Sequence, residues 1–107
     1  MAGQIDKKLA ELGILLPEVG APAANYVPYV KSADLVFVSG QVSRDASGFI
    51  TGKLGAGTSV EAGQAAARTC GIGLISVLRA ACDGNLDRVK RVVKLTGFVN
   101  ATLDFTD

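Results

Sequence analysis

The residues of this chain with the clearest chemical potential are three small or polar ones at the end of an apolar run. The run Leu35–Gln41 begins with four apolar, β-favouring residues, which predict a buried strand, and ends in Ser39, Gly40 and Gln41. Such an end places a hydroxyl, a bare backbone and an amide at the rim of a core, where a ligand can be hydrogen-bonded. The competing interpretation is an ordinary strand end that turns through Gly40, because glycine and serine are common turn residues.

Two other stretches invite a chemical interpretation and do not sustain it. The segment Gly52–Thr58 has the glycines, lysine and threonine of a phosphate loop, but Lys53 precedes the later glycines, so the Gly-Lys-Ser/Thr ending is missing and a flexible connection is expected. Basic residues crowd the segment 88–94, where we expect the solvated face of a strand rather than a phosphate track. The sequence contains no histidine, which excludes a histidine base, a Ser-His triad and a histidine metal site.

Composition indicates one compact domain over residues 1–107. The chain is 49% hydrophobic with a formal net charge of +1, so no charge footprint argues for nucleic acid or an anionic membrane as a partner. A charged N-terminus and the lack of an apolar run of about twenty residues predict a soluble, cytoplasmic protein. Cys70 and Cys82 would lie about 18 Å apart on one helix, too far for a disulfide, so we expect small core thiols in a reducing compartment.

Several elements are needed to position these groups. Apolar residues at helical spacing, Ile5, Leu9 and Leu12, predict a short amphipathic helix that stops at Gly13, with Ile14 as the apolar contact after the glycine. An irregular lead-in rich in proline and small residues follows, from 15 to 28. The strands expected next are Tyr26–Lys31 and Leu35–Gln41, paired as a hairpin that brings Tyr29 near the second strand, and then Phe49–Thr51 after a turn at 44–48.

The second half is expected to supply one long helix and one more strand. Thr58 and Glu61 form a capping-box signature, which predicts a helix that runs to about Ala81 and ends in Asp83-Gly84-Asn85. Alternation of apolar residues predicts a strand over Val89–Val99 with one buried face. The glycines inside the helix are expected to let it lie close against the sheet. Its buried stripe is predicted to comprise Ala66, Cys70, Leu74, Val77, Leu78 and Ala81.

Four stretches together resemble one known family. They are ANYVPYV (residues 24–30), LVFVSGQ (35–41), GKLG (52–55) and DRVKRVVKLTGFVN (87–100), and the chain is similar in all of them to the YjgF/RidA family, also called the L-PSP endoribonuclease family. The phrase LGI-LP at residues 12–17 resembles the branch of that family with an extra N-terminal helix. The resemblance implies an α+β, chorismate-mutase-like fold, in which a long helix packs on one face of a mixed β-sheet.

The resemblance also implies a homotrimer with small-molecule sites in the clefts between subunits, and no cofactor. Tyr29 looks like the tyrosine of the family's Gly-Pro-Tyr segment, Ser39 like the serine of the carboxylate pocket, and Gly40 and Gln41 complete that motif. For Tyr29 the alternative is a strand aromatic packed in the core. The family's carboxylate-binding arginine and late glutamate fall beyond Asp107, so no catalytic residue can be assigned. By this resemblance residues 1–107 form one domain that lacks its C-terminal strands, with an N-terminal helix and lead-in over 1–25.

Three functions remain open at this point. The first is hydrolysis of reactive 2-imino or enamine acids, such as 2-aminoacrylate, to 2-keto acids and ammonia, as the resemblance implies. The second is a non-catalytic trimer that binds a small carboxylate or regulates a partner. The third is the ribonuclease of the older family name, which a near-neutral charge and the lack of histidine disfavour. We expect a small carboxylate or imino acid as ligand, and neither nucleic acid nor a membrane as partner.

Overall fold

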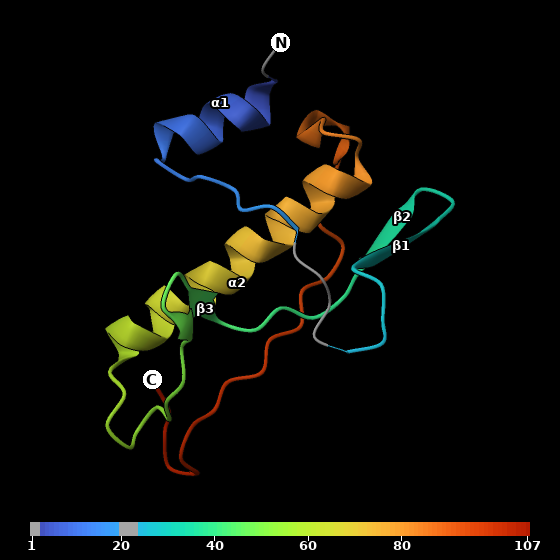
Figure 1. Ribbon diagram of the computed structural model, residues 1–107. Helices are drawn as coiled ribbons and strands as arrows, with labels where there is room; N and C mark the ends of the chain where they lie inside the picture. Colours follow the sequence, from blue (N-terminus) through green and yellow to red (C-terminus); the bar gives the residue numbers. More distant parts are fainter. Residues whose placement is uncertain (1–2, 20–23) are drawn as a thin grey trace. The chain divides into compact units, whose positions relative to one another are not determined.

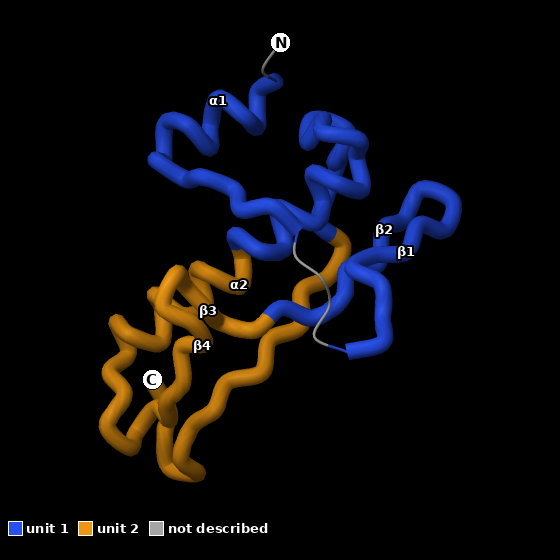
Figure 2. Tube along the Cα trace, in the orientation of Figure 1, with its two compact units in different colours: residues 1–41, 72–92 blue, residues 42–71, 93–107 orange. Residues whose placement is uncertain are grey.

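The computed structural model describes residues 3–19 and 24–107 and contains both helices and strands. The described chain divides into two compact units, residues 1–41 with 72–92 (unit 1) and residues 42–71 with 93–107 (unit 2), as Figure 2 shows. The expectation of a single domain over 1–107 stays a prediction. The elements, drawn in Figure 1, are α1 (Gln4–Glu11), β1 (Tyr29–Ser32), β2 (Leu35–Val38), β3 (Arg44–Asp45), β4 (Gly48–Phe49), α2 (Val60–Ala81) and the 3-10 helix η1 (Leu86–Arg88).

Helix α1 ends as its sequence predicts. Gly13 has a left-handed φ of 69°, and its N–H donates to the Ala10 carbonyl at 3.1 Å. The Ile14 N–H donates to the Leu9 carbonyl at 2.9 Å, which completes a Schellman motif. The predicted glycine stop is therefore confirmed. The expected irregular lead-in is free of helix and strand over 14–19, whereas residues 20–23 lie outside the described part of the chain.

The apolar stripe of α1 is narrower than predicted. Only Leu9 is buried, while Ile5 and Leu12 are 41% and 55% exposed. The helix therefore buries little apolar surface of its own, and a helix of eight residues is too short to be stable in water by itself. Its stability must come from other contacts.

Strands β1 and β2 form the predicted antiparallel hairpin. Tyr29 pairs with Val38 and Ser32 with Leu35, with Ala33 in a left-handed conformation (φ 53°) in the connecting turn. Both strands are shorter than the predicted Tyr26–Lys31 and Leu35–Gln41, because the regular ladder ends at the pair formed by Tyr29 and Val38. One backbone bond continues beyond it, from the Ser39 N–H to the Pro28 carbonyl at 2.9 Å.

A second hairpin occupies the stretch expected to be a turn and a third strand. Arg44 pairs with Phe49 and Asp45 with Gly48, so the predicted turn at 44–48 is wrong at Arg44, Asp45 and Gly48, and the predicted strand Phe49–Thr51 is shifted. The physical reason is the Asp45 carboxylate, whose Oδ1 accepts from the Ser47 N–H at 2.8 Å and closes the turn two residues later than expected. The Arg44 N–H also donates to Thr69 Oγ1 of α2 at 3.2 Å.

Helix α2 covers the predicted range but begins with a different cap. Ser59 Oγ accepts from the Ala62 N–H at 3.1 Å, whereas Thr58 was expected to cap the helix in a capping box with Glu61. Thr58 Oγ1 accepts instead from the Lys53 N–H at 3.0 Å, in the loop before the helix. The predicted cap is therefore wrong by one position, because a competing backbone donor occupies the threonine.

The C-terminus of α2 is a second Schellman motif, at the predicted residues. Asp83 (φ 55°) and Gly84 (φ 88°) both have left-handed backbones. The Asp83 N–H donates to the Ala80 carbonyl at 3.2 Å, and the Gly84 N–H donates to the Arg79 carbonyl at 2.8 Å. An aspartate stands at the position where glycine is usual.

The buried core lies in unit 1. Of the predicted stripe on α2, Val77 (3% exposed) and Ala81 (2%) are buried, and the four others are half-buried. Both cysteines are free, Cys82 buried and Cys70 half-buried. No helix within 3–19 and 24–107 combines the length and the apolar character that crossing a membrane requires. Among the residues that the structure describes, the buried apolar ones are Leu9, Val77, Ala81, Cys82 and Leu86.

The interior glycines of α2 allow close approach at two of three positions, but not the approach of a sheet that the sequence predicts. A Cβ on Gly63 would lie 2.9 Å from a Leu54 methyl, and one on Gly73 would lie 2.6 Å from Gln41 Oε1. At Gly71 no described atom lies within 4 Å of that position. Close approach to α2 therefore involves two segments outside the named strands, at Leu54 and at Gln41, and not the face of a sheet.

The strand expected at Val89–Val99 does not form. Residues 89–100 have no regular secondary structure, and all of 90–100 are exposed. Alternating hydrophobicity shows which side of a strand would be buried, but a strand also needs a hydrogen-bonded neighbour, and the structure pairs only Ala101, as an isolated bridge to Leu54. The described strands therefore form two separate two-stranded sheets and not the expected sheet of three or four strands under a helix.

Candidate functional site

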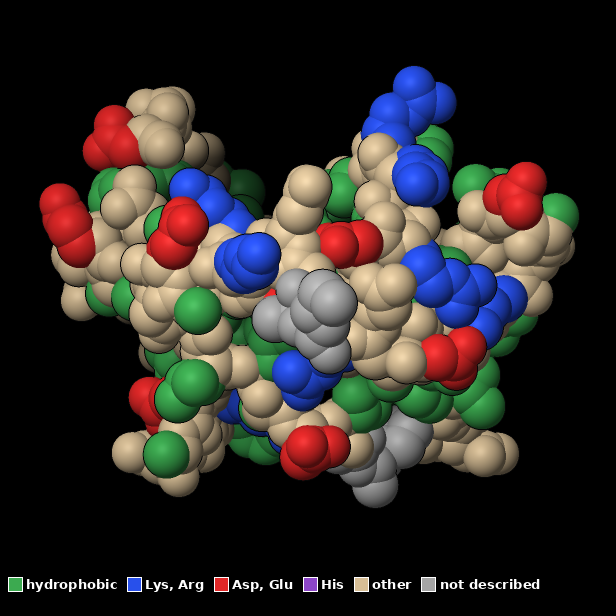
Figure 3. Space-filling view, turned by 90° about the horizontal axis from the view of Figure 1, so that it is seen from above, with side chains coloured by type: hydrophobic (Ala, Val, Ile, Leu, Met, Phe, Trp, Pro, Cys, Tyr) green, Lys and Arg blue, Asp and Glu red, His purple; other side chains and the backbone are tan. Residues whose placement is uncertain are grey.

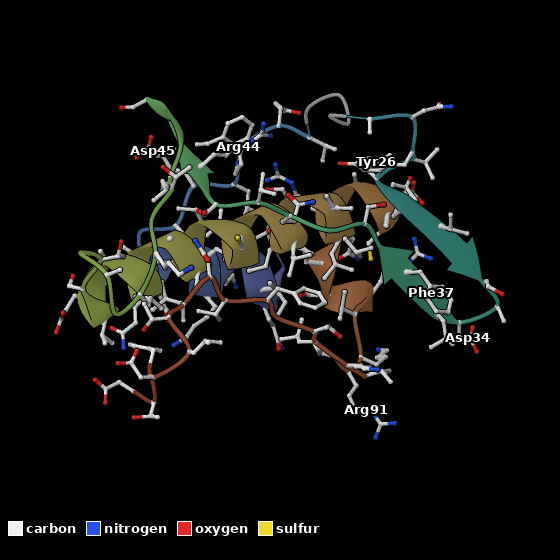
Figure 4. The ribbon with its side chains drawn as sticks, turned by 90° about the horizontal axis from the view of Figure 1, so that it is seen from below. Tyr26, Asp34, Phe37, Arg44, Asp45 and Arg91 are labelled. Atoms are coloured by element: carbon white, nitrogen blue, oxygen red, sulfur yellow. The ribbon has the colours of Figure 1, made fainter. Side chains whose placement is uncertain are left out.

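The four predicted binding residues all belong to unit 1 and lie at one end of the β1–β2 hairpin. Tyr29 is the first residue of β1, and its partner in the ladder is Val38, which directly precedes Ser39. The hairpin therefore brings Tyr29 beside the Ser39-Gly40-Gln41 segment, as the sequence predicts. We call these four residues the rim. Figure 4 shows the same hairpin with Phe37 on β2 and Asp34 at its opposite end, in the turn.

Ser39 is held by two hydrogen bonds to the segment before β1. Its N–H donates to the Pro28 carbonyl at 2.9 Å, and its Oγ donates to the Val27 carbonyl. The hydroxyl is half-buried and its proton is already engaged. Ser39 can therefore accept a hydrogen bond from a ligand as it stands, but it must leave Val27 before it donates to a carboxylate.

Gln41 is placed by a glycine of α2 that the sequence analysis did not assign to the site. Its Oε1 lies 2.6 Å from the position that a Cβ on Gly73 would occupy, so any other residue there would displace the amide. Gly40 is exposed, with no described atom within 4 Å of its own Cβ position, so a ligand can reach its backbone. A glycine inside a helix is a recognisable signal of close approach, but its partner 32 positions away could not be read from the sequence.

Unit 1 also has an open depression of about 340 Å³, which is distinct from the rim. None of the four rim residues lines it. Ser76 at its base is 3% exposed, and its hydroxyl donates to the Ile72 carbonyl at 3.1 Å, so it is already satisfied. The lining residues are Glu18, Val19, Ser76, Arg79, Ala80 and Gly84.

Three backbone N–H groups of the glycine-rich loop in unit 2 already have acceptors within the protein. The Lys53 N–H donates to Thr58 Oγ1 at 3.0 Å, the Leu54 N–H to the Asn100 carbonyl at 3.0 Å, and the Ala56 N–H to the Lys53 carbonyl at 3.1 Å. Asn100 also donates its side-chain amide to the Gly52 carbonyl at 2.7 Å. A phosphate loop needs such N–H groups free to surround an anion, so these bonds argue against one here.

Charges do not gather into a track for a polyanion. The four basic residues of the 88–94 segment are exposed, and Arg88 pairs with Asp83 at 3.3 Å. Figure 3 shows both basic and acidic side chains on the face that it draws. The described residues contain no cluster of three or more potential metal-binding side chains.

Comparisons with known proteins agree with this fold. The family described as "YjgF/chorismate mutase-like, putative endoribonuclease" matches residues 6–105. Protein TCP17 of Trypanosoma cruzi is 50% identical over 107 residues, which are 99% of this chain and 66% of that protein. The crystal structure of Atu1372 from Agrobacterium tumefaciens, a protein of unknown function, has a TM-score of 0.81 at 36% identity, over 94% of this chain and 60% of that one.

A second solved structure, from Shewanella oneidensis and given the same endoribonuclease description, has a TM-score of 0.75 at 35% identity. It matches 81% of this chain and 58% of its own. The chain thus spans about two thirds or less of the length of these relatives. Because the family match extends over nearly the whole chain, the chain belongs to the YjgF/chorismate-mutase-like family and has its α+β fold.

Proposed function

We propose that the protein hydrolyses reactive 2-imino and enamine acids, such as 2-aminoacrylate, to 2-keto acids and ammonia. The observation that supports the proposal is the rim, where Tyr29 lies beside Ser39, Gly40 and Gln41 at the end of one hairpin. A small planar carboxylate needs an apolar wall, hydrogen-bonding groups and open backbone, and these four residues offer all of them.

The proposed reaction requires no cofactor. The enamine first tautomerises to the imine, and water adds to the imine carbon to give a carbinolamine. Its C–N bond then breaks, so that a ketone and ammonia are released. The rim binds and orients the substrate, with the Tyr29 ring as its wall. The Ser39 hydroxyl, once it has left the Val27 carbonyl, donates to the carboxylate, and the Gln41 amide and Gly40 backbone are the other hydrogen-bonding groups. We further propose that a neighbouring copy in a homotrimer completes the cleft and contributes the groups that handle protons.

A non-catalytic carboxylate-binding or regulatory trimer is the second candidate. The rim has no carboxylate, amine or imidazole side chain, so it is better suited to binding than to moving protons. The Ser39 hydroxyl already donates to the Val27 carbonyl, which also favours a binding role over a catalytic one. Endoribonuclease activity is the third candidate and rests on the descriptions of the family and of the Shewanella oneidensis structure. The net charge of +1 and the lack of histidine weigh against it.

The test is a coupled assay in which a pyridoxal-phosphate dehydratase generates 2-aminoacrylate and pyruvate formation is followed. The chain is assayed beside its longer relative from Trypanosoma cruzi. Deamination predicts pyruvate formation faster than the spontaneous rate, with loss of the acceleration in Ser39→Ala. If neither protein accelerates pyruvate formation, the proposed deaminase activity is refuted.

The matched control is Ser43→Ala. Ser43 also donates its hydroxyl to a backbone carbonyl, that of Ile50 at 2.8 Å, but it lies outside the rim. The two variants remove the same group, so a loss common to both would count against a role of the rim. Calorimetric binding of pyruvate without turnover would favour the second candidate. Ribonuclease activity that survives Ser39→Ala and disappears on further purification would mark a contaminant.

A further inference from the structure

Helix α1 lacks a capping side chain of its own. Its N-cap is Gly3, and no side chain from within the helix or next to it satisfies the first N–H groups. The acceptor for two of those groups is a residue more than 80 positions away. Asp87 Oδ2 accepts from the Gln4 N–H at 2.9 Å, and Asp87 Oδ1 accepts from the Ile5 N–H at 3.0 Å. Both oxygens of one carboxylate therefore cap the helix.

The same carboxylate holds α1 against η1, the short helix that contains Asp87. Contacts join α1 and η1, and each contributes one buried apolar side chain, Leu9 and Leu86. Asp87 is itself fixed, because its N–H donates to Asn85 Oδ1 at 3.1 Å. The two helices are thus joined by two charge-assisted hydrogen bonds, and each of them has one buried apolar side chain.

Gly3 is fitted to this carboxylate. Its backbone is extended, with φ −81°, so any residue could adopt it. A Cβ there would nevertheless lie 2.3 Å from Asp87 Oδ2 and 2.8 Å from Cγ. Close approach of the carboxylate is therefore what requires glycine at this position.

We propose that Asp87 acts as a latch, because its one carboxylate both caps α1 and holds it against η1. The N-terminal helix should therefore fold onto η1, and detach from it, as one cooperative unit. Helix α1 is too short to be stable alone and buries only Leu9. Loss of the Asp87 carboxylate would therefore remove both the N-terminal cap of α1 and its attachment to η1. The N–H donors of Ile5 and Gln4, with the nearby charges of Lys7 and Lys90, lower the pKa of Asp87, which is consistent with a carboxylate held in its charged form. This inference is independent of the proposed enzymatic function.

Two variants of the 107-residue chain test the latch. Asp87→Asn removes the charge and one acceptor, and Gly3→Ala leaves Asp87 intact but displaces it sterically. Both should raise amide hydrogen exchange over residues 5–12 by about fivefold, the effect of losing one helix cap, while exchange in α2 is unchanged. Both should also speed tryptic cleavage after Lys7 and Lys8, because these exposed lysines are protected only while α1 is helical.

Asp83→Asn is the matched control. Asp83 is an exposed aspartate of unit 1, and its carboxylate pairs with Arg88 rather than with the α1 N–H groups, which Asp87 accepts. Amide hydrogen exchange in α1 of the Asp83→Asn variant should equal that of the unaltered chain. The proposal is overturned if Gly3→Ala and Asp87→Asn leave α1 exchange unchanged, or if α2 exchange rises as much as that of α1, since the effect would then be global unfolding.

Discussion

The placement of Gln41 against Gly73 can be measured with a double-mutant cycle. Gly71 and Gly73 are both interior to α2, where replacing glycine by alanine stabilises by about 0.5–1 kcal/mol if the new methyl group has room. Gly71 has that room, since no described atom lies within 4 Å of its Cβ position. We therefore expect Gly71→Ala to raise the free energy of unfolding by the full amount.

Gly73→Ala should gain little or nothing. Its methyl carbon would lie 2.6 Å from Gln41 Oε1 and 3.3 Å from Cδ, so the amide must move by about 1 Å to reach ordinary contact. Forcing Gln41 off its rotamer costs about 0.5–1.5 kcal/mol, which offsets the helical gain. In the Gln41→Ala background that cost disappears, and Gly73→Ala should then stabilise as much as Gly71→Ala.

The assay is urea unfolding followed by far-UV circular dichroism, which reports the helices directly. The predicted coupling between Gln41→Ala and Gly73→Ala is about 0.5–1.5 kcal/mol, and that between Gln41→Ala and Gly71→Ala is near zero. Equal gains from Gly71→Ala and Gly73→Ala in the presence of Gln41 would refute the placement of this rim side chain.

Three further predictions concern the helix ends. Gly13→Ala should destabilise α1 by about 1–2 kcal/mol, because alanine is strained at a left-handed φ of 69°, and hydrogen exchange in α1 should rise while that in α2 does not. Asp83→Gly should stabilise by about 0.5–1 kcal/mol in urea unfolding, because glycine suits φ 55° and the exposed ion pair with Arg88 contributes little. A lower unfolding free energy for Asp83→Gly would show that the ion pair outweighs the backbone. Because the pKa of Asp87 is lowered below 3.8 by the N–H donors of Ile5 and Gln4, with Lys7 and Lys90 adding to it, the latch is fully present above that value and is lost as pH falls through the lowered pKa. The amide chemical shifts of Gln4 and Ile5 should titrate with a midpoint below 3.8, and a midpoint above it would contradict the latch.

Local signals in the sequence were sufficient for the helices and the first hairpin. The glycine at position 13 and the Asp83-Gly84 pair determine where the helices end through backbone conformations that few residues adopt, so both ends could be predicted. The N-cap of α2 could not be, because Thr58 and Ser59 are equivalent as sequence signals until a distant donor, the Lys53 N–H, occupies one of them.

What the sequence could not supply are contacts between distant segments. The alternation over Val89–Val99 predicts a strand, but strand formation depends on a partner, and in the described residues the only pairing nearby is the bridge at Ala101. The capping of α1 by Asp87 joins residues more than 80 positions apart. For the rim, the hairpin register made the proximity of Tyr29 and Ser39 predictable, whereas the Val27 carbonyl that holds the Ser39 hydroxyl was not.

The central claim is that the rim binds a small 2-keto or imino carboxylate. The direct measurement is an NMR titration of the chain with pyruvate, a stable product of the proposed reaction. The account predicts saturable shifts of the Ser39, Gly40 and Gln41 amides that are lost in Ser39→Ala and kept in Ser43→Ala. Unmoved rim amides, or shifts confined to the depression beside Arg79, would contradict it.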